Sequence, residues 1–126
     1  MQGLPIIATE EQLISLIQQT DERPLWLYKH NTNCGSSRVA HLALNQFLTR
    51  YPHLSSRFSY AVVRVLEEKA LSGKVAELLQ TPHKSPQILL VHKQKVVWNS
   101  SHQQINSVQL SQLAQHFLQQ HPSLLK

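Results

Sequence analysis

The chain has 126 residues, of which 41% are hydrophobic, and a formal net charge of +5. A chain of this length suits one domain, because two smaller domains would each bury too little apolar surface to offset their conformational entropy. No apolar run approaches the roughly 18 residues that a membrane-spanning helix needs, and the first residues lack the basic start of a secretory signal. We therefore expect a single domain over residues 1–126, located in the cytoplasm and without a membrane partner.

The charged residues, the single cysteine and the histidines exclude several kinds of partner and site. The basic residues are scattered rather than clustered among aromatic ones, so nucleic acid is not an expected partner. Cys34 is the single cysteine, which rules out a disulfide within the chain and a metal site built from several of its thiolates. The histidines show no pair spaced by four residues on one predicted helix, and no metal site is predicted. Any covalent chemistry of Cys34 must involve another molecule.

The first half of the chain predicts a helix and a strand, followed by another of each. Thr9 and Gln12 have the spacing of a capping box at a helix start, and Pro24 stops any continuation of that helix. In chain order, we expect a helix from residue 9 to about 21, a buried strand at 25–28, a polar loop at 30–35, a helix from 36 to about 51 and a strand at 58–66.

The second half adds one helix, a hairpin and a last helix. The predicted elements are a helix at 71–79, a loop at 81–86, strands at 87–91 and 95–98, a helix capped by Ser107, and a frayed tail at about 120–126. A strand–helix–strand crossover needs parallel strands, and the hairpin adds an antiparallel pair. The predicted fold class is therefore α/β, with a central mixed four-stranded sheet flanked by about four helices.

Cys34 lies in the loop after the first strand, at or just before the start of the second helix. Unpaired N–H groups and the positive end of the helix dipole favour the thiolate there, which is the nucleophilic form of cysteine. Lys29, His30 and Arg38 are close enough in sequence to add positive charge. A free cysteine is most often a small buried apolar residue. Because polar or small residues flank Cys34 on both sides, we predict a reactive thiol instead.

Two further positions give this cysteine a chemical context. In Cys34-Gly35-Ser36-Ser37, Ser37 stands where a dithiol enzyme carries its second cysteine. A hydroxyl can donate a hydrogen bond to the thiolate but cannot displace a mixed disulfide, so release needs an external thiol. Pro86 precedes the third strand, where folds that use this chemistry place a cis proline facing the cysteine, and we predict a cis bond between Ser85 and Pro86. With these positions, the order of elements is a thioredoxin-like arrangement.

Five segments of the chain together match the pattern of one family. They are Lys29-His30, Cys34 with Ser37, His83-Lys84-Ser85-Pro86-Gln87, Val97-Trp98 and Ser101-His102. On these residues the chain resembles the monothiol bacilliredoxins, a branch of the thioredoxin superfamily, from about residue 25 to the last helix. The resemblance implies a thiol–disulfide oxidoreductase that takes bacillithiol, a cysteinyl thiol with acidic groups, from modified protein cysteines. Cys34 and Ser37 would be catalytic, and the predicted substrate contacts are Lys29, His30, Gly35, Ser36, Arg38, His83, Ser85 and Pro86.

One departure from the family and two other functions stay open. The family motif reads close to Thr-Cys-Pro-Ile-Ser, whereas Gly35 and Ser36 follow the cysteine here, so glutathione or another small thiol could replace bacillithiol. The motif is also one residue from the Cys-Gly-Phe-Ser of monothiol glutaredoxins, which share an iron–sulfur cluster between two chains. A third possibility is a non-catalytic adaptor that binds an extended peptide near Pro86. The expected partners are S-thiolated proteins and a small thiol co-substrate, with no tightly bound cofactor, and the chain is expected as a monomer or weak dimer.

Overall fold

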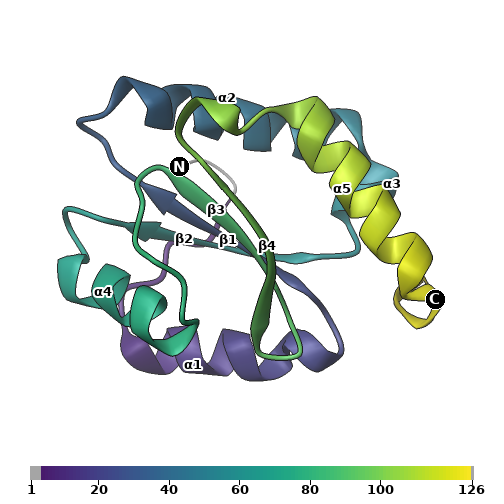
Figure 1. The fold of residues 1–126 in the computed structure, drawn as a ribbon, viewed down its shortest axis with the longest axis horizontal. Helices are drawn as coiled ribbons and strands as arrows, with labels where there is room; N and C mark the ends of the chain where they lie inside the picture. Colours follow the sequence, from purple (N-terminus) through teal and green to yellow (C-terminus); the bar gives the residue numbers. More distant parts are fainter. Residues whose placement is uncertain (1–3, 126) are drawn as a thin grey trace.

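The computed structural model describes residues 4–125 and shows a four-stranded sheet between two layers of helices (Figure 1). The strands are β1 (Leu25–His30), β2 (Ser59–Arg64), β3 (Gln87–His92) and β4 (Lys95–Ser101). The helices are α1 (Glu10–Gln18), α2 (Gly35–Arg50), α3 (Pro52–Ser55), α4 (Lys69–Leu78) and α5 (Ser107–Gln120), with 3-10 turns at Gln19–Asp21, His102–Gln104 and Pro122–Leu125. α2 and α5 cover one face of the sheet, and α1 and α4 cover the other.

The sheet is mixed, with the strand order β2-β1-β3-β4. β1 and β2 pair in parallel, because α2 carries the chain back between them, whereas β3 runs antiparallel to both β1 and β4. The fold class predicted from the order of elements is confirmed. α3 is a further short helix, which begins at Pro52 immediately after α2 ends.

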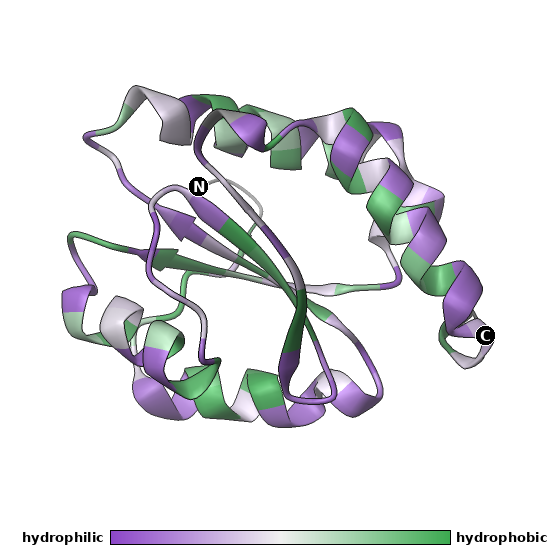
Figure 2. Cartoon of the chain, in the orientation of Figure 1, coloured by the Kyte–Doolittle hydropathy of each residue, from purple (hydrophilic) through white to green (hydrophobic). Residues whose placement is uncertain are grey.

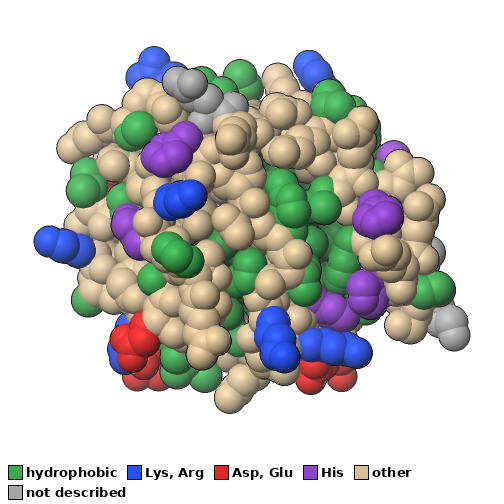
Figure 3. Space-filling view, in the orientation of Figure 1, with side chains coloured by type: hydrophobic (Ala, Val, Ile, Leu, Met, Phe, Trp, Pro, Cys, Tyr) green, Lys and Arg blue, Asp and Glu red, His purple; other side chains and the backbone are tan. Residues whose placement is uncertain are grey.

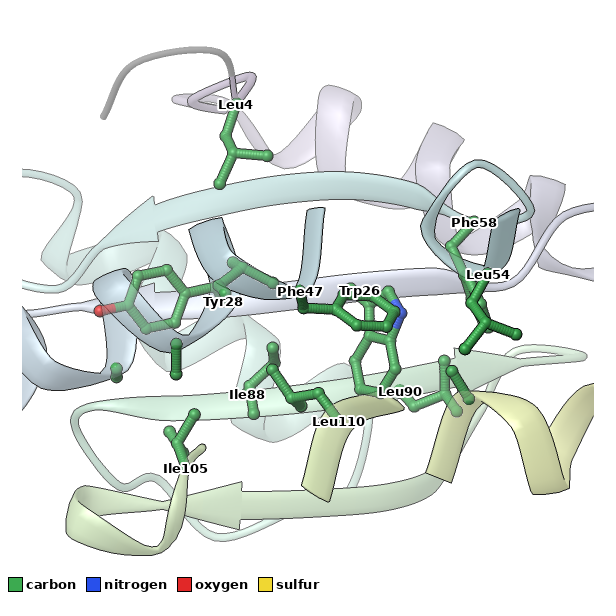
Figure 4. Packing of buried hydrophobic residues seen from close by; sticks show 14 of the residues in the cluster. Leu4, Trp26, Tyr28, Phe47, Leu54, Phe58, Ile88, Leu90, Ile105 and Leu110 are labelled. Carbon is green, nitrogen blue, oxygen red and sulfur yellow. The ribbon is translucent and has the colours of Figure 1, made fainter. Parts of the chain in front are cut away.

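Alternate side chains of β1 enter two separate cores. Trp26 and Tyr28 point toward α2 and α5, into a cluster rich in aromatic rings (Figure 4). Leu25 and Leu27 point toward α1 and α4, into an aliphatic cluster. Figure 2 shows hydrophobic and hydrophilic residues alternating along the helices, as expected for helices that cover a sheet. Because a strand has a period of two residues, the same alternation decides which residues at the end of β1 lie beneath α2.

The predicted start of α1 is confirmed, whereas the predicted cap of α5 is wrong by one residue. Thr9 and Gln12 form the predicted capping box of α1. The cap of α5 is Asn106 rather than Ser107, since the Asn106 side chain accepts the N–H of the third helical residue. The Ser107 hydroxyl donates instead to the side chain of Gln46 on α2, at 3.1 Å. Asparagine and serine cap helices about equally well, so this shift by one residue is decided by the contact with α2.

The end of the chain differs from the expected frayed tail. α5 continues to Gln120, and a 3-10 turn follows at Pro122–Leu125. Leu124 packs against the aromatic core, which holds this segment in place. Lys126 lies outside the described residues. Within residues 4–125, none of the helices combines the length and the apolar character needed to cross a membrane.

Candidate active site

The end of β1 sets the positions of the residues around the cysteine. β1 continues to His30, beyond the strand predicted at 25–28. Because side chains alternate along a strand, His30 lies on the same face as Tyr28, toward α2, while Lys29 points toward α4. Lys29 is fully buried there. The structure therefore places Lys29 on the face of the sheet away from α2 and not, as expected, beside the thiol.

Cys34 is the N-cap residue of α2, with an extended backbone and a part-exposed side chain. Three hydrogen bonds hold the loop before it. The Cys34 N–H donates to the Asn31 carbonyl at 3.1 Å, and the Asn33 N–H donates to Asn31 Oδ1 at 3.0 Å. The Asn31 N–H donates to the Ser37 hydroxyl at 3.0 Å. Asn31 therefore ties the end of β1 to the first turn of α2 and fixes where the sulfur lies.

Hydrogen bonds from the first turn of α2 lower the pKa of the Cys34 thiol. The backbone N–H of Ser36 is the largest cause, desolvation acts in the opposite direction, and the Ser37 N–H and the Ser36 hydroxyl add to the lowering. These donors stabilise the thiolate, which accepts hydrogen bonds better than the neutral thiol. The direction agrees with the expectation from the helix start. The largest contributions to the lowering come from these local donors, and the cations expected nearby are not among them.

The Ser37 hydroxyl does not lie where the sequence placed it. Ser37 is buried on the inward face of α2 together with Ala40 and Leu44, and its oxygen accepts the Asn31 N–H. The side-chain hydroxyl that helps to lower the pKa of Cys34 is that of Ser36, one residue earlier. The Ser37 side chain therefore acts as a positioning group, which holds the loop against the helix start.

A cavity of about 400 Å³, here called the thiol cavity, opens beside Cys34. Arg38, His30 and His41 are among its lining residues. The rings of the two histidines lie 6.1 Å apart, and His30 Nδ1 is 2.8 Å from the Tyr28 hydroxyl. Burial is the main cause that lowers the pKa of both histidines, so both rings are neutral at pH 7. The thiol therefore faces polar groups, and Arg38 is the charged one among these three residues.

The predicted contact residues of the loop before β3 gather at a different place. Lys29 Nζ lies 3.1 Å from His83 Nδ1. His83 and Ser85 line a second cavity of about 400 Å³, here called the His83 cavity, which shares Asn31 with the thiol cavity. The peptide bond between Ser85 and Pro86 is cis, and Pro86 is buried. That Pro86 faces the thiol stays a prediction.

Sequence patterns missed Asn31 and His41 in the thiol cavity, and Lys69 and Ser72 in the His83 cavity. His41 follows Cys34 by about two helical turns, so helix periodicity could have placed it on the same side. Lys69 and Ser72 reach the His83 cavity from α4 only through the tertiary fold, and no local pattern signals this.

The first turn of α2 leaves space at the position where the family motif has proline. A Cβ at Gly35 would meet no atom within 4 Å, so packing does not require glycine there. Ser36 beside it is half-buried and its hydroxyl helps to lower the pKa of Cys34, a role that an apolar residue could not fill. Across residues 4–125, no three His, Cys, Asp or Glu side chains converge on a possible metal position.

Solved structures share this fold over nearly the whole chain. A protein described as an oxidoreductase with a thioredoxin fold is 26% identical, with a TM-score of 0.75, over 90% of this chain and 96% of that one. Fasciola hepatica thioredoxin is 18% identical, with a TM-score of 0.69, over 90% and 98% of the two chains. Trypanosoma brucei brucei thioredoxin is 11% identical, with a TM-score of 0.71, over 94% and 97%.

With a part-exposed cysteine capping the helix after the first strand, the fold and the site define a thiol–disulfide oxidoreductase of the thioredoxin class. The one cysteine of the chain makes it a monothiol protein. The model of the monothiol bacilliredoxin BrxC family matches residues 6–110, which is most of the chain. The chain belongs to this family, and the resemblance seen in its sequence is confirmed.

Proposed function

We propose that this protein removes a low-molecular-weight thiol, bacillithiol or a similar one, from mixed disulfides on protein cysteines. The placement of Cys34 carries the proposal: its sulfur is part-exposed at the N-cap of α2, where N–H donors lower the pKa of the thiol. A lowered pKa raises the thiolate fraction near neutral pH, and the thiolate is the attacking species. Membership of the monothiol bacilliredoxin family supports the same chemistry.

Two exchange steps account for the reaction. In the first, the Cys34 thiolate attacks the small thiol's sulfur in the mixed disulfide. A new S–S bond forms between Cys34 and the small thiol, the old S–S bond breaks, and the protein cysteine leaves as a thiolate. In the second, another small-thiol anion attacks the sulfur now bound to Cys34. The products are a low-molecular-weight disulfide and the Cys34 thiolate, so the protein cysteine is reduced while the incoming small thiol is oxidised, and the small thiol that was removed stays in a disulfide.

The second step needs an external thiol because Ser37 stands in the place of a resolving cysteine. Serine cannot form a disulfide, and its hydroxyl oxygen already accepts the Asn31 N–H. The adduct on Cys34 therefore persists until a free thiol arrives. The cytoplasm is a compartment that keeps such thiols reduced, and we place the reaction there.

The direct test is to incubate the reduced protein with bacillithiol disulfide and, separately, with glutathione disulfide, and to measure its mass. We expect one small-thiol adduct per chain, absent from Cys34→Ser, and faster with one of the two disulfides. A matched control is the double variant Cys34→Ser/Ser56→Cys, since Ser56 is exposed after a short helix rather than at a helix start. Its thiol is expected to react at the rate of an ordinary exposed cysteine.

Each other outcome contradicts the proposal in a recognisable way. If neither disulfide forms an adduct, or if the control cysteine reacts as fast as Cys34, the site has no special reactivity. Full binding of an extended peptide by Cys34→Ser would favour the adaptor. Visible absorbance after anaerobic purification would favour a shared iron–sulfur cluster.

A further inference from the structure

Lys29 is a fully buried lysine without an acidic partner among the described residues. Its side chain is 0% exposed, and its hydrogen-bond partner within residues 4–125 is His83, with Nζ 3.1 Å from Nδ1. A buried ammonium normally needs a counter-charge or several hydrogen bonds, because its desolvation is costly. The fold supplies one neutral acceptor here, and an anionic ligand nearby would supply the missing counter-charge.

The contact with Lys29 also fixes the tautomer of His83. An ammonium group can only donate, so Nδ1 of His83 accepts and the ring proton sits on Nε2. Desolvation, and after it the charge of Lys29, lower the pKa of His83, and the ring therefore stays neutral at pH 7. With Nδ1 turned to Lys29, the Nε2–H on the other side of the ring is left for a ligand.

The His83 cavity combines a mostly apolar lining with a few groups that can bind an anion. Besides His83, it is lined by Lys69 at its rim and by Ser72 and Ser85, whose hydroxyl oxygens are buried without a partner among the described residues. Ser72 is 3% exposed. No aspartate or glutamate is among the lining residues. Figure 3 shows lysine, arginine and histidine side chains at several places on this face of the molecule, whereas the acidic ones lie mainly along its lower edge.

Gly73 keeps this cavity open on the side of α4. Glycine inside a helix is less favourable than alanine by about 1 kcal/mol, so a reason for it is expected. Gly73 lines the His83 cavity, and a Cβ there would meet no atom within 4 Å. Close packing therefore does not demand glycine at this position. The missing side chain leaves room beside Ser72 for part of a ligand.

The two cavities share one lining residue. Asn31 lines both, and its carbonyl accepts the Cys34 N–H at 3.1 Å. Asn31 therefore separates the thiol from the His83 cavity, and a small molecule on Cys34 would have to reach past this residue to enter that cavity. A thiol that carries carboxylates would bring the anion that this cavity lacks.

We propose that the His83 cavity binds a carboxylate of the small thiol carried on Cys34, with the Nε2–H of His83 as the donor and Lys29 as the residue that positions His83. The proposal rests on the proposed function and adds to it the group that recognises the small thiol. Lys69 at the rim adds positive charge. Lys29 touches His83 and not the ligand, so its effect is exerted through the tautomer and orientation of the ring.

The test compares two disulfides that differ in charge, glutathione disulfide and the uncharged 2-hydroxyethyl disulfide. The second-order rate of adduct formation on Cys34 is measured by mass at pH 7 for the full chain. We expect His83→Ala and Lys29→Met to slow the reaction of Cys34 with glutathione disulfide about tenfold. This is the usual effect of losing a hydrogen bond to a charged group. The same variants are expected to change the rate with 2-hydroxyethyl disulfide less than about twofold, because that molecule has no carboxylate.

Two matched comparisons separate charge from shape. Lys74→Met removes a lysine from the same helix layer, where Lys74 pairs with Glu10 and Glu77 away from the cavity, and is expected to leave both rates unchanged. Gly73→Glu and Gly73→Gln put side chains of equal size at the cavity, and only the glutamate should repel the anion. A histidine ¹⁵N spectrum supplies a readout of positioning: the Nε2–H tautomer of His83 is expected in the wild type and should be lost or mixed in Lys29→Met.

The outcomes distinguish this inference from the proposed function. If Cys34 reacts with neither disulfide, both fail. If Cys34 reacts with both disulfides and every variant slows the two reactions equally, the proposed carboxylate site is wrong, while the proposed thiol–disulfide exchange stands. If His83→Ala slows exchange with an acidic peptide thiolated by uncharged 2-mercaptoethanol, the carboxylate comes from the polypeptide, and the proposal for the small thiol is overturned.

Discussion

The two cavities at the end of β1 share Asn31 but differ in their chemistry. The thiol cavity is polar and holds the reactive sulfur, with the neutral rings of His30 and His41 beside it. The His83 cavity is mostly apolar, with charge supplied at its rim and from Lys29 behind the ring of His83. The nucleophile and the uncompensated cation are thus kept on opposite faces of one strand.

This separation has a chemical consequence for the thiol. The pKa of Cys34 is lowered by neutral N–H and O–H donors, which stay in place whatever the ligand carries. A lysine that itself stabilised the thiolate would instead be neutralised by each anionic ligand that binds. Placing Lys29 on the other face lets recognition of an acidic thiol proceed without altering the donors that hold the thiolate. The period of a strand is what makes this possible, because adjacent residues point to opposite faces.

The largest expected effect comes from removing the buried cation. Burial lowers the pKa of Lys29 to about 8 from 10.5. Below pH 8 both the folded and the unfolded chain carry the proton, and the folded state bears the full cost of the buried charge. Between pH 8 and 10.5 the folded state loses the proton first, so this group makes the free energy of unfolding rise with pH. The difference corresponds to about 3 kcal/mol.

Lys29→Met should therefore be more stable than the wild type at pH 7, and its advantage should shrink by about 3 kcal/mol as the pH rises to 10.5. Urea unfolding of both proteins at several pH values measures this difference, in which the titrations of all other groups cancel. Lys74→Met, which removes a half-buried lysine that pairs with Glu10 and Glu77, serves as the control. A constant difference across the range would show that Lys29 has an ordinary pKa.

A smaller effect is expected on the face that carries the thiol. The Tyr28 hydroxyl donates to the Ser37 carbonyl at 3.0 Å and lies 2.8 Å from His30 Nδ1. Tyr28→Phe removes both contacts and keeps the ring in the aromatic core, so we expect a loss of about 1–1.5 kcal/mol in unfolding free energy. Alkylation of Cys34 should keep its pH dependence, because the donors to the sulfur remain. A large change in that dependence would mean that Tyr28 tunes the thiol directly.

Much of the fold could be predicted because its signals are local. The capping box at Thr9, the apolar periods of the helices and the short hairpin each occupy a few neighbouring residues, and their order leaves few topologies. The length of β1 was the main error at the site. Ending the strand at Tyr28 left the directions of the Lys29 and His30 side chains undefined, whereas two more residues of strand send them to opposite faces.

The rest of the site depends on contacts that no local pattern encodes. Lys29 and His83 are 54 positions apart, and their pairing requires the loop before β3 to lie over the end of β1. The cap of α5 shifted to Asn106 because Ser107 met Gln46 across the layer of helices. Ser37 is a different case. Its spacing from Ala40 and Leu44 marks the buried side of α2, so helix periodicity alone could have turned its hydroxyl inward.

The smallest expected effects separate the two serines that follow the thiol. Ser36→Ala removes a hydroxyl that helps to lower the pKa of Cys34 but keeps the larger contribution of the backbone N–H. The pKa of Cys34 should therefore rise while staying below that of a free cysteine, with little change in stability. Ser37→Ala removes the acceptor of the Asn31 N–H, which should cost about 1 kcal/mol of unfolding free energy.

The pH dependence of iodoacetamide alkylation measures the pKa of Cys34, and urea unfolding measures the free energy of unfolding. Because the Ser37 hydroxyl is absent from the causes of the thiol's shift, Ser37→Ala should alter the pKa of Cys34 less than Ser36→Ala does. The opposite order would return the thiolate-stabilising role to the Ser37 hydroxyl, as the sequence motif first indicated. It would also mean that the hydrogen bond between Asn31 and Ser37 breaks when Cys34 ionises, so that the loop holding the sulfur rearranges during the reaction.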